Sequence, residues 1–239
     1  MLNNYCEKAQ LKDRQDVMDL GCGWGSVSLF VAAKYPNSRI TSVSNSKTQR
    51  EYIENEAKKR GIKNINVITN DINVLTIDDL KFDRIISIEM FEHMKNYEKL
   101  LEKLSSWLKP KGMLFVHYFS HKDYPYDFAD GDWMADNFFS GGTMPSHDLL
   151  LYFQKDLQVI NHWKVSGKHY EKTSNDWLAN MDKKEHQHRI REIFEQTYGR
   201  ENVNKWIMKW RLFFIACAEL FGFNNGNEWI ISLFLFQKK

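Results

Sequence analysis

Apolar and polar positions alternate in a regular order over roughly the first 120 residues. Short apolar runs predict buried strands at residues 16–20, 39–44, 64–70, 83–88 and 112–119. The mixed segments around them predict helices at residues 2–11, 26–34, 48–60 and 97–108, with Pro36 and Gly61 as stop signals. Strands that alternate with helices indicate an α/β fold with a doubly wound, mostly parallel sheet, whose ligands bind at the carboxyl ends of the strands.

The pattern changes after Phe119. Residues 120–150 are aromatic and irregular, which predicts a cap, and residues 156–165 and 229–237 predict two closing strands of a seven-stranded sheet. Polar helices at about 174–197 and an aromatic helix at 203–222 lie between these strands. We therefore expect one domain over 1–239, with a core at about 12–120 plus the closing strands. The cap at about 120–155 and the helices at about 170–225 are expected to form an inserted helical lid.

Composition and charge argue against some classes of function. The net charge is +2 in 239 residues, which gives no electrostatic reason to expect nucleic-acid binding. The apolar segment 206–223 is interrupted by charged residues and predicts a packed helix, so no stable membrane insertion is expected. Three widely spaced cysteines and the absence of an apolar leader favour a reducing, cytoplasmic location. No metal site is expected, and a homodimer is left open.

The segment 17–26 predicts a strand, a glycine-rich turn and the start of a helix. Gly21, Gly23 and Gly25 allow a ligand to approach the main chain, and Asp19 precedes them. A carboxylate at this point would repel the pyrophosphate of a dinucleotide. It suits a ligand with a positive amino group, such as S-adenosylmethionine. The alternative is a glycine-rich turn without a ligand.

Later strand ends add candidate cofactor contacts. Ser44 and Gln49 are predicted to bind ribose hydroxyls through neutral hydrogen bonds, although an ordinary helix cap explains them equally well. Asp71 is predicted to accept a hydrogen bond from an adenine amino group while Ile72 packs on the ring, with a turn aspartate as the alternative. The expected contacts at these strand ends are Ser44, Asn45, Gln49, Asp71, Ile72 and Ile88.

The segment 88–97 carries the most specific cluster of chemical groups. Glu89, Glu92 and His93 have the spacing i, i+3, i+4, which would place all three on one face of a helical turn. Two carboxylates and an imidazole held together can bind a cation and remove a proton. The alternative is an ordinary solvated helix face. The position of the cluster at the end of a strand favours a functional site instead.

Several segments resemble the plant coclaurine N-methyltransferase group of the cyclopropane fatty acid synthase-like methyltransferases. The resemblance rests on DLGCGWG at 19–25, SIEMFEHMKNY at 87–97, FFSGGTMPS at 138–146 and LLLYFQ at 149–154, and it extends from about Tyr5 to Lys239. It implies a Rossmann-like class I methyltransferase that transfers a methyl group from S-adenosylmethionine to the nitrogen of a benzylisoquinoline-like arylalkylamine, leaving S-adenosylhomocysteine. It also implies that Glu92 and His93 remove the proton from the amine, and that Glu89 lines the pocket.

Two departures from the resemblance keep alternatives open. Members of the group carry a long segment before the glycine turn, whereas here only 18 residues precede Asp19, so part of the lid is expected to be missing. The related cyclopropane synthases bind bicarbonate through a cysteine in that segment and a histidine at the position of His117. The alternatives are a lipid methylene transferase of the synthase type and a non-catalytic cofactor-binding relative.

The substrate pocket is expected to be aromatic, because aromatic faces attract cationic amines and stack on planar rings. Its candidate substrate-binding residues are Phe91, His117, Tyr118, Trp210, Phe213 and Phe214, with Phe119, Phe138 and Phe139 as further wall candidates. Any single aromatic residue in this set has a competing explanation as ordinary core.

Overall fold

The computed structural model of the chain describes residues 1–77, 81–129, 131–139 and 141–239. Residues 130 and 140, within the predicted cap, lie outside the described residues. The chain forms two compact units. Unit 1 comprises residues 1–119, 148–163 and 232–239, and unit 2 comprises residues 120–147 and 164–231.

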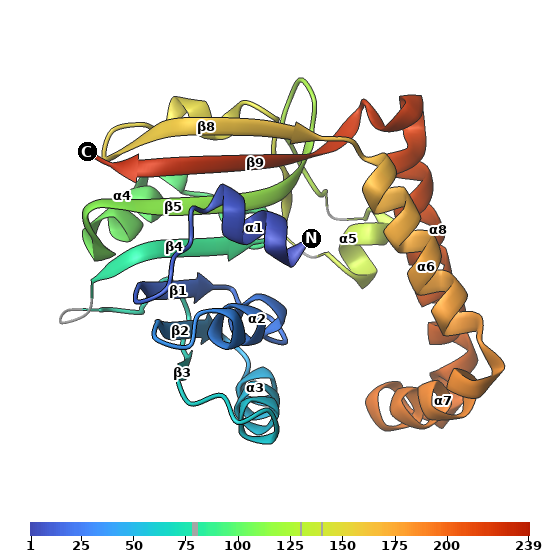
Figure 1. The fold of residues 1–239 in the computed structure, drawn as a ribbon. Helices are drawn as coiled ribbons and strands as arrows, with labels where there is room; N and C mark the ends of the chain where they lie inside the picture. The colour runs from blue at the N-terminus through green and yellow to red at the C-terminus, as the bar shows by residue number, and fades with distance from the viewer. Residues whose placement is uncertain (78–80, 130, 140) are drawn as a thin grey trace. The chain divides into compact units, whose positions relative to one another are not determined.

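Within the described residues, seven strands form one sheet in the order β3-β2-β1-β4-β5-β9-β8 (Figure 1). The strands are β1 (Asp16–Leu20), β2 (Arg39–Ser44), β3 (Ile65–Thr69), β4 (Phe82–Ile88), β5 (Leu108–His121), β8 (Leu157–Val165) and β9 (Trp229–Lys238). The pairs that join β3, β2, β1, β4 and β5 are all parallel. The arrow of β9 runs against that of β8 in Figure 1. The predicted doubly wound, mostly parallel sheet is therefore confirmed.

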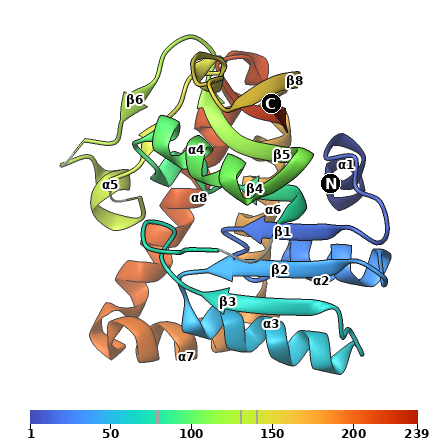
Figure 2. The ribbon, with the colours of Figure 1, turned by 90° about the vertical axis from the view of Figure 1, so that its left-hand side faces the viewer.

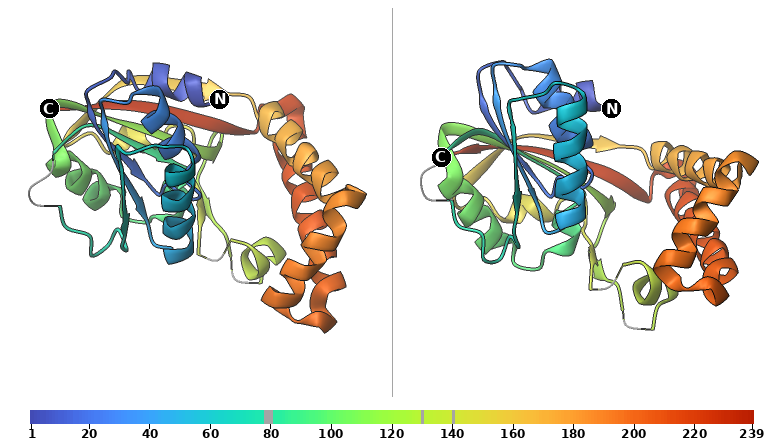
Figure 3. Two further views of the ribbon diagram at one scale, coloured as in Figure 1. Left: turned by 60° about the horizontal axis from the view of Figure 1, so that its bottom comes forward. Right: turned by 90° about the horizontal axis from the view of Figure 1, so that it is seen from below.

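The helices of unit 1 follow the predicted order. They are α1 (Leu2–Lys8), α2 (Ser26–Lys34), α3 (Lys47–Lys59) and α4 (Tyr97–Trp107), with short 3₁₀ turns η1 (Phe91–His93) and η2 (Leu149–Tyr152). Ser46 and Asn96 cap α3 and α4, because each side chain accepts a hydrogen bond from the backbone three residues later. Figure 3 shows α2 and α3 on one face of the sheet and α4 on the other.

The parallel strands bring their carboxyl ends to one edge of the sheet. β1, β2 and β3 lie side by side with their arrowheads at the same edge (Figure 2). Each of these strands contains buried apolar residues, such as Met18, Val43 and Val67. In β1 and β2 every residue after the first is buried, including polar ones such as Asp19 and Ser42, so neither strand shows the alternating pattern of a half-exposed sheet. Strand β5 begins four residues earlier than predicted, since Leu108 already pairs with Phe82 before a bulge.

Unit 2 contains mainly helices, α5 (Trp133–Asn137), α6 (Lys168–Asp182), α7 (Lys184–Tyr198) and α8 (Val203–Gly226), with the 3₁₀ turn η3 (Arg200–Asn202). A short hairpin pairs β6 (Tyr126–Asp127) with β7 (Thr143–Met144). Helices α6 and α8 lie side by side (Figures 1 and 3). No helix among the described residues is long and apolar enough to cross a membrane.

Two details of unit 2 differ from the sequence prediction. The polar helical segment starts earlier than expected and divides at Lys183, whose backbone is extended with a ψ of 131°. Regular helical conformation in α8 stops at Gly222, as predicted, because Phe223 is extended and Asn224 and Asn225 have positive φ. A left-handed backbone of this kind is tolerated best by asparagine and glycine.

Candidate active site

The glycine turn after β1 is shaped by two close approaches. Gly21 has a φ of +77°, and a Cβ atom added to it would lie 2.7 Å from Met90 Cγ. Gly25 has a φ of +80°, and its added Cβ would lie 2.6 Å from Ile53 Cγ1. Gly23 also has a positive φ but faces open space, with no described atom within 4 Å of its added Cβ. Gly21 and Gly25 thus allow tight packing, and Gly23 leaves its main chain accessible to a ligand.

Asp19 lies beneath this turn and is only 2% exposed. Its Oδ2 accepts a hydrogen bond of 2.5 Å from Ser28 Oγ, which in turn accepts one of 2.7 Å from Ser42 Oγ. Burial raises the pKa of Asp19 from its usual 3.8 to about 6, against the opposing effect of Ser28. Asp19 is therefore a buried ionisable group under the turn, and it does not line the cavity at the carboxyl ends of β1 to β4.

A cavity of about 550 Å³ opens at the carboxyl ends of β1 to β4. Its volume falls within the range of ligand pockets in proteins. Seven predicted cofactor contacts line it, namely Gly21, Gly23, Ser44, Asn45, Gln49, Asp71 and Ile72, together with the predicted catalytic residues Glu89 and His93. Leu20, Val43, Asn70, Asn73, Met90 and Met94 also line it and were not predicted. Gly25 and Ile88, which were expected to contact a ligand, are not among the lining residues.

The predicted polar contacts on β2 and β3 are already oriented within the protein. Ser44 Oγ donates a hydrogen bond of 2.6 Å to Gln49 Oε1. Asp71 Oδ1 accepts hydrogen bonds from the backbone and side-chain nitrogens of Asn73, at 2.8 and 2.9 Å. Both explanations offered by the sequence are therefore compatible: these residues form local turns and also line the cavity.

The structure does not place Glu89, Glu92 and His93 on one helix face. Helix formation here is limited to the 3₁₀ turn η1, and Glu89 lies before it with a φ of +53°. Glu89 and His93 line the cavity, whereas Glu92 is completely buried. The expectation of a shared face is wrong, because the chain turns sharply between β4 and η1 instead of continuing as a helix.

The three groups differ in their electrostatic environment. Burial, with a smaller effect of Glu89, raises the pKa of Glu92 well above its usual range and favours the protonated acid. Glu92 Oε1 accepts a hydrogen bond of 3.0 Å from the Phe119 backbone N–H, and Oε2 has no partner among the described residues. Desolvation lowers the pKa of His93 below 6.5 although Glu89 opposes the shift. His93 is therefore mainly a neutral imidazole at pH 7, which is the form that accepts a proton.

Three predicted substrate residues of unit 1 do not line the cavity. Phe91 and Tyr118 are completely buried in the core, where they stack on Tyr97 and Phe234 with ring centroids 6.3 and 5.6 Å apart. Neither is among the residues that line the cavity at the ends of β1 to β4. His117 is 8% exposed, and its ring bonds to Tyr5 and Glu89. A sequence pattern cannot distinguish a core aromatic residue from a pocket aromatic residue at a strand end.

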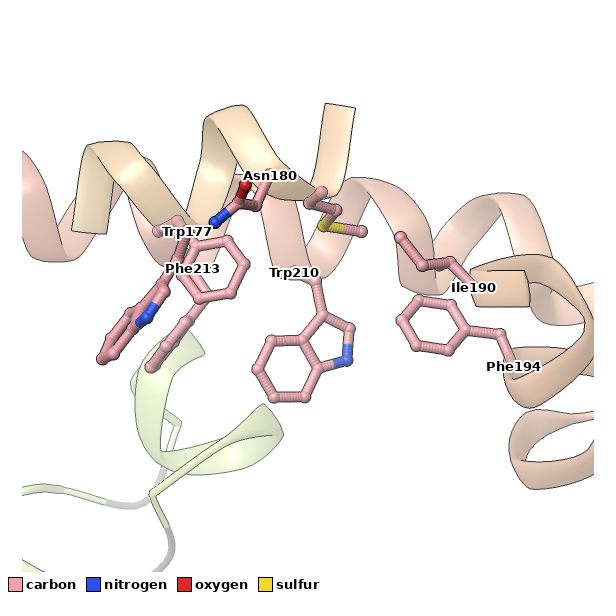
Figure 4. Close-up of a pocket in the computed structure, with 8 residues that line it drawn as sticks. Trp177, Asn180, Ile190, Phe194, Trp210 and Phe213 are labelled. Atoms are coloured by element: carbon pink, nitrogen blue, oxygen red, sulfur yellow. The ribbon is translucent and has the colours of Figure 1, made fainter. Parts of the chain in front are cut away.

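Unit 2 contains a second cavity, of about 510 Å³, between α6, α7 and α8 (Figure 4). Its lining consists of apolar side chains and one amide: Trp177, Asn180, Met181, Ile190, Phe194, Trp210, Phe213 and Phe214. Phe138 packs on this group, with its ring centroid 4.9 Å from that of Trp210 and 4.6 Å from that of Phe213. The predicted residues Trp210, Phe213 and Phe214 thus share an aromatic, uncharged cavity.

Comparison with known proteins agrees with this architecture. The family model described as mycolic acid cyclopropane synthetase matches residues 2–229. The (S)-coclaurine N-methyltransferase of Thalictrum flavum subsp. glaucum is 45% identical over 246 residues, which cover 100% of this chain and 67% of that protein. The pavine N-methyltransferase of the same plant is 41% identical and covers 100% of this chain and 68% of that protein.

A solved structure shows the same fold. The crystal structure of coclaurine N-methyltransferase bound to N-methylheliamine and SAH superposes with a TM-score of 0.93 and 44% identity. The superposition covers 100% of this chain and 72% of that one. Together with the open glycine turn and the cavity at the ends of β1 to β4, these similarities identify the chain. It belongs to the mycolic acid cyclopropane synthetase family, in the branch of the coclaurine N-methyltransferases, and is an S-adenosylmethionine-dependent methyltransferase.

Proposed function

We propose that this chain methylates the nitrogen of a small arylalkylamine of the benzylisoquinoline type. The observation that carries the proposal is the 45% identity over the whole chain to a protein named (S)-coclaurine N-methyltransferase. The pavine N-methyltransferase, at 41% identity, supports the same substrate class. The proposed product is a methylated amine together with S-adenosylhomocysteine.

The cavity of unit 1 fits S-adenosylmethionine. The exposed main chain at Gly23 and the carboxylates of Glu89 and Asp71 suit a ligand with positive charge. Ser44 and Gln49 offer neutral hydrogen-bonding groups, and Ile72 offers an apolar surface. When bound, the cofactor supplies an electrophilic methyl group on a sulfonium, which needs no further activation by the protein.

The proposed role of the protein is to deliver a neutral amine. A free alkylamine has a pKa near that of lysine, about 10.4, and is therefore protonated at pH 7. Glu89 attracts the ammonium group at the cavity, and His93 accepts its proton on a ring nitrogen. The nitrogen lone pair is then available for the methyl group. Alignment of the reacting atoms contributes about 7 kcal/mol or more to the lowering of the barrier.

Glu92 has a supporting part in this proposal. Its Oε1 accepts the Phe119 N–H and so ties η1, which carries His93, to β5. Because Glu92 is completely buried and its pKa is raised, it acts as a neutral acid rather than as a second carboxylate facing the amine. In this proposal Glu92 assists His93 by holding η1 in place, and it does not take the proton itself.

The aromatic cavity of unit 2 is proposed as a binding surface for planar aromatic rings. Its lining carries no charged side chain among the described residues, and its rings offer faces for stacking. Trp210 lies between the side chains of α6 and α7 in Figure 4. Trp210, Phe213 and Phe214 are therefore proposed to determine the affinity for the amine rather than the chemical step.

A mass-spectrometric methylation screen tests the proposal. The chain is incubated with S-adenosylmethionine and a panel of primary and secondary arylalkylamines, and in parallel with vesicles of unsaturated phospholipid. We expect a mass gain of one methyl group on amines only. The His93→Ala variant should lower kcat/KM by about 10² to 10⁴-fold with unchanged cofactor affinity. His188→Ala, at an exposed histidine of α7, is the matched control. Methylene transfer to lipid, or cofactor binding without turnover of any amine, would overturn the proposal.

A further inference from the structure

Glu89 is held in an unusual conformation by its neighbours. Its φ of +53° lies in the left-handed region, which is uncommon for a residue other than glycine, asparagine or aspartate. The Glu89 backbone N–H donates a hydrogen bond of 2.9 Å to the His117 carbonyl oxygen, and the next residue, Met90, packs against Gly21. These contacts fix the direction in which the Glu89 side chain leaves the chain.

The side chain of His117 completes the attachment. Its Nε2 lies 3.1 Å from Glu89 Oε1, and its Nδ1 lies 2.9 Å from the Tyr5 hydroxyl oxygen. Both His117 and Tyr5 are buried, with 8% and 3% exposure. The Tyr5 ring also meets the His117 ring edge-on, with centroids 5.4 Å apart, and packs on Phe115. Both nitrogens of the imidazole are therefore used inside the protein.

One placement of the hydrogens lets all three groups pair. An ionised Glu89 can only accept, so His117 Nε2 carries a hydrogen and donates it. In the neutral imidazole Nδ1 is then an acceptor, and it receives the hydroxyl hydrogen of Tyr5. Burial and the charge of Glu89 raise the pKa of Tyr5, which keeps it a phenol and a donor. The sequence of bonds from Tyr5 through His117 to Glu89 has one consistent direction.

We propose that Tyr5 and His117 are positioning residues for methyl transfer, and that these buried hydrogen bonds hold the Glu89 carboxylate aimed into the cavity at the ends of β1 to β4. The effect on turnover rests on the proposed function, in which Glu89 attracts the ammonium group. The hydrogen bonds between Tyr5, His117 and Glu89 do not depend on the proposed function, because they are present in the protein without a substrate. Histidine side chains oriented by a second hydrogen bond are commonly used to fix a functional group.

The first experiment reads the histidine directly. Imidazole ¹⁵N NMR of the full chain, assigned with a His117→Gln variant, should show the hydrogen of His117 on Nε2 rather than on Nδ1. The Tyr5→Phe variant, which removes only the hydroxyl oxygen, should shift the Nδ1 resonance. The matched control is Tyr126→Phe in unit 2, where the lost hydroxyl bonds to Trp229. A His117 signal with the Nδ1–H tautomer, or one unchanged by Tyr5→Phe, would overturn the proposal.

The second experiment is a double-mutant cycle on turnover. We expect Tyr5→Phe to lower kcat/KM for the amine by about 3- to 10-fold, the effect of one hydrogen bond, with unchanged cofactor affinity. In a Glu89→Gln background the same change should have no further effect, because the carboxylate that it orients is gone. A merely structural role of Tyr5 would lower the melting temperature in both backgrounds and leave kcat/KM of the folded protein unchanged.

The two experiments separate the possible failures. If the wild-type protein methylates no amine, the proposed function fails. The NMR result still shows whether Tyr5, His117 and Glu89 are hydrogen-bonded as proposed. If amines are methylated and Tyr5→Phe acts equally in both backgrounds, the positioning role is refuted while the proposed function stands.

Discussion

The buried carboxylate of Asp19 makes the stability of this protein depend on pH, and Asp19→Asn should remove that dependence. Asp19 is 2% exposed, and burial raises its pKa from 3.8 to about 6 in the folded protein. The folded state then binds the proton more tightly than the unfolded state. Stability from this group is complete below pH 3.8 and is lost as the pH rises toward and through 6.

The magnitude follows from the shift. A difference of about 2 pKa units corresponds to about 3 kcal/mol of unfolding free energy, since one unit is worth about 1.4 kcal/mol. Roughly half of it is lost between pH 5 and pH 8, which is about 1.4 kcal/mol. Asparagine has no charge to desolvate and can still accept the Ser28 hydroxyl hydrogen, so the variant lacks this decline.

Urea unfolding at pH 5 and pH 8, followed by tryptophan fluorescence, measures the effect. The quantity compared is the change in unfolding free energy between the two pH values, because a constant difference in packing between the variants cancels. Between pH 5 and pH 8, we expect the unfolding free energy of Asp19→Asn to rise by about 1.4 kcal/mol relative to that of wild type. Identical pH profiles for the two proteins would refute the argument that a buried, ionising Asp19 lies under the turn.

Three further predictions concern the turn, the buried acid and the aromatic cavity. Gly21→Ala should lower the unfolding free energy by more than Gly61→Ala, measured in urea. Both positions have positive φ, which costs about 1 kcal/mol for alanine, but only Gly21 would collide with Met90. Equal losses would contradict that contact. The melting temperature of Glu92→Gln minus that of wild type should be larger at pH 8 than at pH 5, because the raised pKa of Glu92 makes its ionisation in the folded protein unfavourable. The same difference at both pH values would argue against a raised pKa of Glu92. Trp210→Ala should raise KM for the amine by about 10-fold and leave the cofactor affinity unchanged, by titration calorimetry and kinetics. An unchanged KM would exclude the unit 2 cavity from amine binding.

Much of unit 1 could be predicted because its signals are local. The apolar run at β1, the stop at Gly61 and the cap at Asn96 each act within a few residues, and the observed elements agree closely with the predicted ranges. The glycine turn was equally clear. The different roles of its three glycines could not be predicted, because the contact of Gly25 with Ile53 depends on how α3 packs against the turn.

The candidate site was predicted as a set of strand ends, and residues at the ends of β1 to β4 line the cavity. The helical face proposed for Glu89, Glu92 and His93 was wrong, because spacing alone does not show that the backbone leaves the helical region at Glu89. The burial of Glu92 and the bond from Tyr5 to His117 were also hidden, since the latter joins residues 112 positions apart. The unpredicted lining residues Asn70, Met90 and Met94 lie next to predicted ones, so position on a strand end was their only signal.

The most direct measurement of the central claim is a crystal structure of the chain with S-adenosylhomocysteine. We predict that the ligand lies against the Gly21–Gly23 turn and within reach of Ser44 and Asp71, with its sulfur directed toward Glu89 and His93. A ligand bound elsewhere, or His93 turned away from the sulfur, would contradict it.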